Sequence, residues 1–371
     1  MRKDIQNTAE IKRIEEIKKT TEIIKVNEAC LDDAVIRRAG EIIRAGGLVA
    51  FPTETVYGLG ADALQAQAAE KIYAAKGRPS DNPLIVHICR MEDLEKIVTQ
   101  VPEQARKLAQ AFWPGPLTMI LNKNDCVPDR TTGGLASVAV RMPANRIALA
   151  LIRSGGGFIA APSANLSGRP SPTLAEHVWE DLQGRIPLIL DGGAVGIGIE
   201  STIADLTGEI PVILRPGYIT MEMLAGVIGQ VRIDPGIVDE ASGIKPKAPG
   251  MKYKHYAPKA EMVLVEGKPQ QVVWAINRLA AAQEAEGKKA GIIAAAETAD
   301  CYRHGFVVSI GDRGNEDTIA HNLYRILREL DKSGADIIYS ESFSTPRIGQ
   351  AIMNRMLKAA GHQVIQAESL G

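Results

Sequence analysis

The segment FPTETVYGLG at residues 51–60 constrains this chain more than any other, because it places polar groups where a buried strand ends. The apolar run GLVAF at residues 47–51 predicts that strand, and Pro52 ends it because proline has no N–H for a ladder hydrogen bond. The TET triplet that follows offers hydroxyl and carboxylate groups, and the glycines beyond it lack the Cβ that would keep a ligand from the backbone. The pattern predicts a ligand site at the end of this strand.

A second segment, KGRPSDNPLIVHI at residues 76–88, adds fixed positive charge. Lys76 and Arg78 lie on a turn stiffened by prolines, and His87 follows within the next apolar run. Cations on a rigid loop beside a hydroxyl-rich strand end are typical of a site for phosphate and a small polar molecule. The alternative is that the TET triplet caps a helix and the cations are solvated, but a cap explains neither the prolines nor His87.

Helical patterns alternate with short β-rich runs over residues 28–231, which predicts an α/β domain. We expect a helix over residues 32–45 and strands over residues 84–88, 117–121, 138–141 and 188–190. Residues 1–27 are expected to be an N-terminal extension, in which Ile11, Ile14 and Ile17 suit a short amphipathic helix.

Residues 232–259 are expected to form a linker. Between Lys245 and Lys259 there are five lysines and three prolines but no acid, which argues against a helix. Aromatic residues and a histidine beside these lysines favour a linker that folds over the ligand, the alternative being an inert tether.

Residues 260–371 restart the pattern as a second unit. We expect strands over residues 262–267, 289–295 and 335–342, and helices over residues 270–285, 318–330 and 348–360. This alternation predicts a small parallel sheet, and no G-x-G-x-x-G supports dinucleotide binding. A lid, docking or regulatory role is expected for this unit.

Further motifs follow the two opening segments in order: FWPGPLTMIL from Phe112, SVAVRMP from Ser137, APSANLSGRPSPT from Ala161, STIADL from Ser201, LRPG from Leu214 and PGMKYKHYAP from Pro249. Together they resemble the YrdC family, the L-threonylcarbamoyladenylate synthases that serve tRNA modification. The last motif and the residues beyond it resemble the longer, two-domain branch. The implied fold is a YrdC-like twisted open-sheet α/β domain, a linker and a smaller Rossmann-like parallel α/β domain.

The resemblance also implies a reaction. The amine of L-threonine captures bicarbonate or CO2, and the new carboxylate attacks the α-phosphorus of ATP to give threonylcarbamoyl-AMP and pyrophosphate, for modification of the adenosine at tRNA position 37. Mg²⁺ is expected to accompany ATP without dedicated protein ligands. A downstream tRNA threonylcarbamoyl transferase is an expected transient partner, and no stable nucleic-acid binding is expected.

Site residues carry over onto matching positions. The L-threonine group is Thr55, His87, Arg141, Ala161 and Ser201. The ATP group is Arg78, Asn82, Ser137, Ser163, Ser171, Arg215, Tyr253 and Tyr256, with His255 a further candidate. Lys76 and Arg78 are the expected catalytic cations.

Several of these residues have a simpler interpretation. Arg141 could form only a strand-end salt bridge, and His87 could be a hydrogen-bonded core histidine. Either serine of the ATP group near Thr173 could cap a helix. The glycine-rich run at residues 191–202 could be a turn or a phosphate cradle, and it has no lysine where a P-loop requires one. Thr53 and Glu54 stay unassigned.

Composition excludes other classes. The net charge is −1, so no global basic field attracts nucleic acid or anionic lipid, which disfavours an RNA-binding module. The four cysteines are scattered without a C-x-x-C pair, which disfavours the zinc-finger-bearing carbamoyl-transferring relative of hydrogenase maturation. No apolar run reaches the roughly twenty residues of a membrane span, and a cytoplasmic location is expected.

Overall fold

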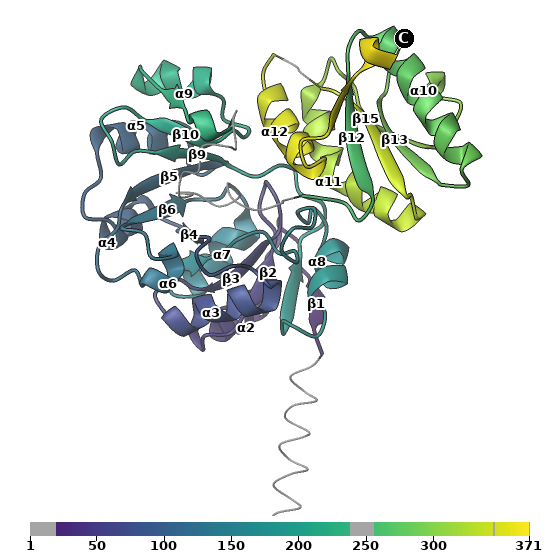
Figure 1. Cartoon of the computed structure of the whole chain (residues 1–371). Coiled ribbons are helices and arrows are strands. Elements are labelled where there is room, and N and C mark those ends of the chain that lie inside the picture. The colour runs from purple at the N-terminus through teal and green to yellow at the C-terminus, as the bar shows by residue number, and fades with distance from the viewer. Residues whose placement is uncertain (1–19, 238–255, 344–345, 371) are drawn as a thin grey trace, which may run out of the picture.

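A computed structural model describes residues 20–237, 256–343 and 346–370. It contains two α/β domains (Figure 1), so the predicted fold class is confirmed. The predicted amphipathic helix near Ile14 and most of the predicted linker lie outside the described residues.

The first domain is built on an eleven-stranded sheet of order β1-β8-β2-β3-β7-β4-β6-β5-β9-β10-β11, with both parallel and antiparallel pairs. Its strands are β1 (Glu22–Lys25), β2 (Val49–Phe51), β3 (Gly58–Asp62), β4 (Ile85–His87), β5 (Leu117–Asn122), β6 (Ser137–Arg141), β7 (Ile159–Ala160), β8 (Leu188–Asp191), β9 (Thr202–Asp205), β10 (Val212–Arg215) and β11 (Arg232–Ile233).

Helices surround this sheet: α2 (Asp33–Arg44), α3 (Ala66–Lys76), α4 (Leu94–Ile97), α5 (Glu103–Phe112), α6 (Asp129–Thr132), α7 (Arg146–Ser154), α8 (Ala175–Leu182) and α9 (Met221–Ile228). Side chains alternate across each strand, so Val49 and Phe51 join one core with α2 and α7, whereas Ala50 joins the core on the other face with α3, α5 and α8. Asp32 begins α2 because its carboxylate accepts the N–H groups of Ala34 and Val35.

The second domain has a five-stranded sheet of order β14-β13-β15-β12-β16, and all its pairs are parallel. Its strands are β12 (Glu261–Glu266), β13 (Ala290–Ala295), β14 (Phe306–Gly311), β15 (Ile337–Glu341) and β16 (Val364–Gln366). The helices are α10 (Pro269–Ala285), α11 (Glu316–Ser333) and α12 (Gly349–Ala359).

The domains pack through α11 and α12, which lie on the side of the second domain nearest the first (Figure 1). Val56 and Ile199 of the first domain belong to the same buried apolar cluster as Tyr324 and Ile352. A Cβ on Gly198 would lie 2.5 Å from the carbonyl oxygen of residue 320, so α11 comes close to the first-domain backbone.

The structure shifts some expected boundaries. Strand β1 pairs with β8 although it lies within residues 1–27, so the sheet begins inside the expected extension. Strand β11 pairs with β10 and lies beyond residue 231. The pattern also missed β3, whose glycines are atypical of strands, and β14, whose residues are partly exposed.

Within the described ranges, no helix is long and apolar enough to cross a membrane.

Candidate active site

A cleft lies in the first domain where the ends of β2, β4 and β6 meet the loops before β9 and after β10. The cleft and its open mouth together contain about 660 Å³ of empty space, and the cleft is lined by both polar and apolar side chains. Its lining residues are Thr53, Thr55, Val56, Gly58, Arg78, Ile85, His87, Arg141, Ala161, Pro162, Ser163, Asn165, Arg169, Ser171, Glu200, Ser201, Arg215 and Tyr256.

The turn after β2 is shaped by Thr53. Its Oγ1 accepts the N–H groups of Thr55 at 3.1 Å and Val56 at 3.3 Å, and donates to the carbonyl of Val56 at 2.7 Å. A strand, β3, follows this turn, so the helix-cap alternative is wrong. Gly60 serves the sheet rather than a ligand, because a Cβ there would lie 2.9 Å from the ring of Phe51.

Arg141 and His87 are brought together by pairing of parallel strands β4 and β6, which places them opposite each other. Arg141 donates from Nη1 to Thr55 Oγ1 at 2.9 Å and from Nε to the carbonyl of Gly115 at 3.2 Å. Its Nη2 lies 2.7 Å from Glu54 Oε1. A guanidinium has five N–H donors, so these partners leave donors for a ligand carboxylate.

His87 is neutral in this environment. The residue is 4 % exposed, and its ring Nδ1 lies 3.2 Å from the carbonyl of Ile85. Burial, followed by the charge of Arg141, lowers the pKa of His87 to about 3. A neutral imidazole beside a guanidinium adds a polar group without adding a second positive charge.

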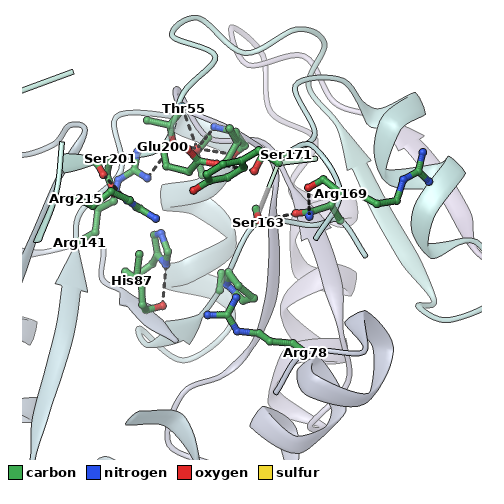
Figure 2. A pocket seen from close by; sticks show the side chains of 18 residues that line it. Thr55, Arg78, His87, Arg141, Ser163, Arg169, Ser171, Glu200, Ser201 and Arg215 are labelled. Atoms are coloured by element: carbon green, nitrogen blue, oxygen red, sulfur yellow. Dashed lines mark hydrogen bonds between the residues drawn. The ribbon is translucent and has the colours of Figure 1, made fainter. Parts of the chain in front are cut away.

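Ser201 and Arg215 form the wall next to Arg141 (Figure 2). Arg215 donates from Nη2 to Ser201 Oγ at 3.1 Å and from Nε to the Ser201 carbonyl at 3.0 Å. Ser201 Oγ also lies 2.8 Å from the hydroxyl of Thr118 on β5. This network fixes both side chains where β9 begins and β10 ends.

Ser163, Arg169 and Ser171 lie together on the other side of the view in Figure 2. Ser163 donates to Asn165 Oδ1 at 2.5 Å, and Ser171 donates to Glu200 Oε1 at 2.6 Å. Neither caps α8, whose first turn has no side-chain cap. The helix-cap interpretation of these serines is therefore wrong.

The cleft favours anions. Four arginines and one carboxylate, that of Glu200, are among its described lining residues. Arg78 donates to the Asn82 and Pro83 carbonyls, and Arg215 donates to Ser201, so both bond neutral acceptors. Across the described part of the chain, no group of three or more His, Cys, Asp or Glu side chains could hold a metal ion.

Comparisons with known proteins agree with this arrangement. Residues 41–217 match the family model for Sua5, YciO and YrdC, described as telomere recombination, and residues 219–361 match the threonylcarbamoyl-AMP synthase C-terminal domain. The threonylcarbamoyl-AMP synthase of Pyrococcus abyssi is 50 % identical over 336 residues, covering 91 % of this chain and 97 % of that protein. That of Bacillus subtilis is 49 % identical over 341 residues, covering 92 % and 97 %.

The chain belongs to the threonylcarbamoyl-AMP synthase family. Both domain models match, so it has the long, two-domain form. A crystal structure of Pyrococcus abyssi Sua5 complexed with L-threonine superposes with a TM-score of 0.88 at 49 % identity, covering 93 % of this chain and 99 % of that one. Threonylcarbamoyl-AMP synthesis is therefore the activity of this chain.

Most of the site residues expected from the sequence lie together in this cleft. Thr55, His87, Arg141, Ala161 and Ser201 all line the cleft. So do five residues of the expected ATP group, Arg78, Ser163, Ser171, Arg215 and Tyr256. The ring of Tyr256 also packs on Tyr324, with centroids 5.2 Å apart. Tyr253 and His255 lie outside the described residues.

Three expected residues lie outside the lining. Lys76 is 2 % exposed and donates to the carbonyls of Ser163 and Asn165, so it supports the serine loop from behind. Asn82 accepts from Arg78 at 2.5 Å and so holds that arginine. Ser137 begins β6 opposite Asn122 and is not among the lining residues.

Two amides of the glycine-rich run at residues 191–202 are used within the protein, because Ile197 N–H donates to the Glu54 carbonyl at 2.8 Å and Gly198 N–H to the Thr55 carbonyl at 3.1 Å. These two amides hold the run against the turn after β2. Sequence reasoning missed Glu200 within this run, although an acid in the apolar stretch GIGIE signals a buried charge that needs a partner. Asn165 and Arg169 were also missed.

Proposed function

We propose that this synthase joins L-threonine, bicarbonate or CO2, and ATP by adenylyl transfer. The amine of threonine bonds to the carbon of CO2 and loses a proton, and the carboxylate so formed attacks the α-phosphorus of ATP. The bond from that phosphorus to the bridging oxygen breaks, and pyrophosphate leaves. The observation that carries the proposal is the arginine-lined cleft, which suits several anionic groups at once.

The amino-acid side of the cleft is Thr55, His87, Arg141, Ala161 and Ser201. The solved Pyrococcus abyssi relative contains L-threonine. Arg141 is suited to the threonine carboxylate, because a planar guanidinium can donate two parallel hydrogen bonds. The neutral ring of His87 tolerates an adjacent amine, because it carries no charge that would repel an ammonium group.

The nucleotide side is Arg78, Ser163, Ser171, Arg215 and Tyr256. Arg78 and Arg215 would stabilise the charge that grows on the phosphoryl oxygens, and the serine hydroxyls would bond nucleotide oxygens. Asn82 and Lys76 would act indirectly, the first by orienting Arg78 and the second by supporting the backbone of Ser163.

Other participants follow from this chemistry. Mg²⁺ would arrive with ATP and neutralise its phosphates. The product is a mixed anhydride, so a transferase that passes the threonylcarbamoyl group to tRNA must consume it. The cytoplasmic location remains a prediction.

The test is pyrophosphate release by the purified full chain. Release is expected only when ATP, L-threonine and bicarbonate are all present, and Arg78→Gln should reduce it strongly. Equal release with carbamoyl phosphate and no threonine would overturn the proposal in favour of carbamoyl transfer. Salt-dependent RNA binding without pyrophosphate release would favour an RNA-binding module.

A further inference from the structure

Arg355 of α12 binds the first domain at the two positions next to cleft residues. Its Nη1 donates to the carbonyl of Pro216, which follows Arg215. Its Nη2 donates to the carbonyl of Glu200 at 3.3 Å, which precedes Ser201. One guanidinium from the second domain thus joins the backbone beside both Arg215 and Ser201.

The same side chain holds the carboxylate of Glu200. Nε of Arg355 donates to Glu200 Oε2 at 3.1 Å, and the hydroxyl of Tyr324 on α11 donates to the same oxygen at 2.7 Å. The other oxygen, Oε1, accepts from Ser171. Glu200 therefore connects two second-domain residues to a serine of the cleft.

All members of this network are buried. Arg355 and Ser171 are each 1 % exposed, Tyr324 is 0 % and Glu200 is 6 %. Burial opposes ionisation of Glu200, yet the charges of Arg355 and Arg215 hold its pKa below the usual value. A buried carboxylate needs such a counter-charge, and Arg355 supplies it from outside the cleft.

This arrangement determines what Arg215 can do. Glu200 and Arg215 both line the cleft and attract each other electrostatically. Because Arg355 already neutralises Glu200, Arg215 is held on Ser201 and its charge stays available to an anionic ligand. Without Arg355, Glu200 would become the competing partner of Arg215.

We propose that Arg355 and Tyr324 are positioning residues of the second domain, which fix Glu200 and so place Ser171, Ser201 and Arg215 for the nucleotide. This rests on the proposed function in that the ligand they place is ATP. The second domain is then part of the nucleotide site rather than only a lid or docking surface.

The experiment compares Tyr324→Phe, Arg355→Lys and Arg355→Gln with the wild-type full chain. The KM for ATP is expected to rise about tenfold in Arg355→Gln and several-fold in the other two, with the KM for L-threonine changed by less than about twofold. Tyr324→Phe removes one hydroxyl only, so its melting temperature tests whether the effect is structural. Lys332→Gln is the control, because the exposed side chain of Lys332 bridges the domains through ion pairs with Glu176 and Glu180.

A charge-neutralising second substitution separates positioning from simple domain loosening. Adding Glu200→Gln to Arg355→Gln removes the competing carboxylate, so the KM for ATP should recover by at least about threefold relative to Arg355→Gln alone. Variants with unchanged KM values would overturn the proposal, and so would a Lys332→Gln control that loses ATP affinity equally. If the wild type released no pyrophosphate in response to threonine, the proposed function would be contradicted instead. Calorimetric binding of ATP to the same variants tests the positioning role separately from that activity.

Discussion

The guanidinium of Arg141 lies 2.7 Å from the carboxylate of Glu54 and joins the end of β6 to the turn after β2. Only 5 % of the Arg141 side chain and 14 % of the Glu54 side chain are exposed. The strand-end salt bridge considered from sequence is therefore present, and it gives Glu54 a role. It does not exclude ligand binding, since the pair fixes a donor-rich group on the cleft wall.

Arg141→Lys is expected to weaken L-threonine binding by about 10- to 100-fold, because an ammonium cannot make the paired hydrogen bonds of a guanidinium. Isothermal titration calorimetry measures this directly. Arg146→Lys is the matched control: Arg146 is exposed and donates to the carbonyl of Ala29, away from the cleft. Equal threonine affinity in Arg141→Lys and wild type would remove Arg141 from the binding site.

Two buried histidines make stability depend on pH. Burial lowers the pKa of both His87 and His177 to about 3, against about 6.5 when unfolded. Between these values the unfolded chain binds more protons, so stability is complete above pH 6.5 and falls as the pH drops toward 3. Each histidine contributes a slope of up to about 1.4 kcal/mol per pH unit.

Urea unfolding at pH 7, 6 and 5 measures this slope. His177→Asn should make it shallower, because an asparagine oxygen can still accept the N–H of Thr173 without titrating. In nuclear magnetic resonance, the His87 ring should show no titration between pH 5 and 8. A His87 titration near pH 6.5 would mean that its ring is not buried in solution.

The local elements of the fold could be predicted from sequence because their signals are local. Apolar runs next to a proline predicted β2 and β4, and periodic patterns predicted α2, α11 and α12. Strand β3 was not predicted, because two of its five residues are glycines and weaken the strand pattern. Both glycines leave room for the ring of Phe51, which a Cβ at either position would crowd. Packing across the sheet, not propensity, decides that segment.

Site residues could be predicted from the sequence only where they belong to a family motif. Lys76 was placed among the catalytic cations because charge on a rigid loop favours phosphate, but its ammonium group meets carbonyls 87 and 89 residues away. Glu200 meets Tyr324 and Arg355 across 124 and 155 residues. No short pattern encodes such pairs, because the partners become neighbours only when the domains pack.

Lys76→Met is expected to lower both stability and turnover, since the carbonyls of Ser163 and Asn165 would lose their buried donor. Two unsatisfied buried carbonyls cost about 2–6 kcal/mol together. Thermal melting and pyrophosphate release check the two effects. Full stability with abolished turnover would instead return Lys76 to a direct catalytic role.

Removal of divalent metal is expected to abolish ATP-dependent turnover while leaving the protein folded, because the proposed Mg²⁺ is carried by ATP and neutralises its phosphates. EDTA should leave the melting temperature and L-threonine affinity unchanged, and Mg²⁺ should restore turnover. A large fall in melting temperature with EDTA would reveal a structural metal instead.

Tyr256 is expected to be the linker aromatic that matters most. Its ring lines the cleft, and the N–H of the next residue, Ala257, donates to the carbonyl of Gly168 at 2.9 Å, which anchors the chain here. Tyr256→Ala should raise the KM for ATP by about tenfold through lost packing, whereas Tyr256→Phe keeps the ring against Tyr324 and should change the KM by less than about threefold.

Tyr253→Ala and His255→Ala, measured separately, show whether these two linker residues also contribute to ATP binding. Alanine at all three positions should abolish turnover with a normal melting temperature, and unchanged turnover would show that the linker is a tether.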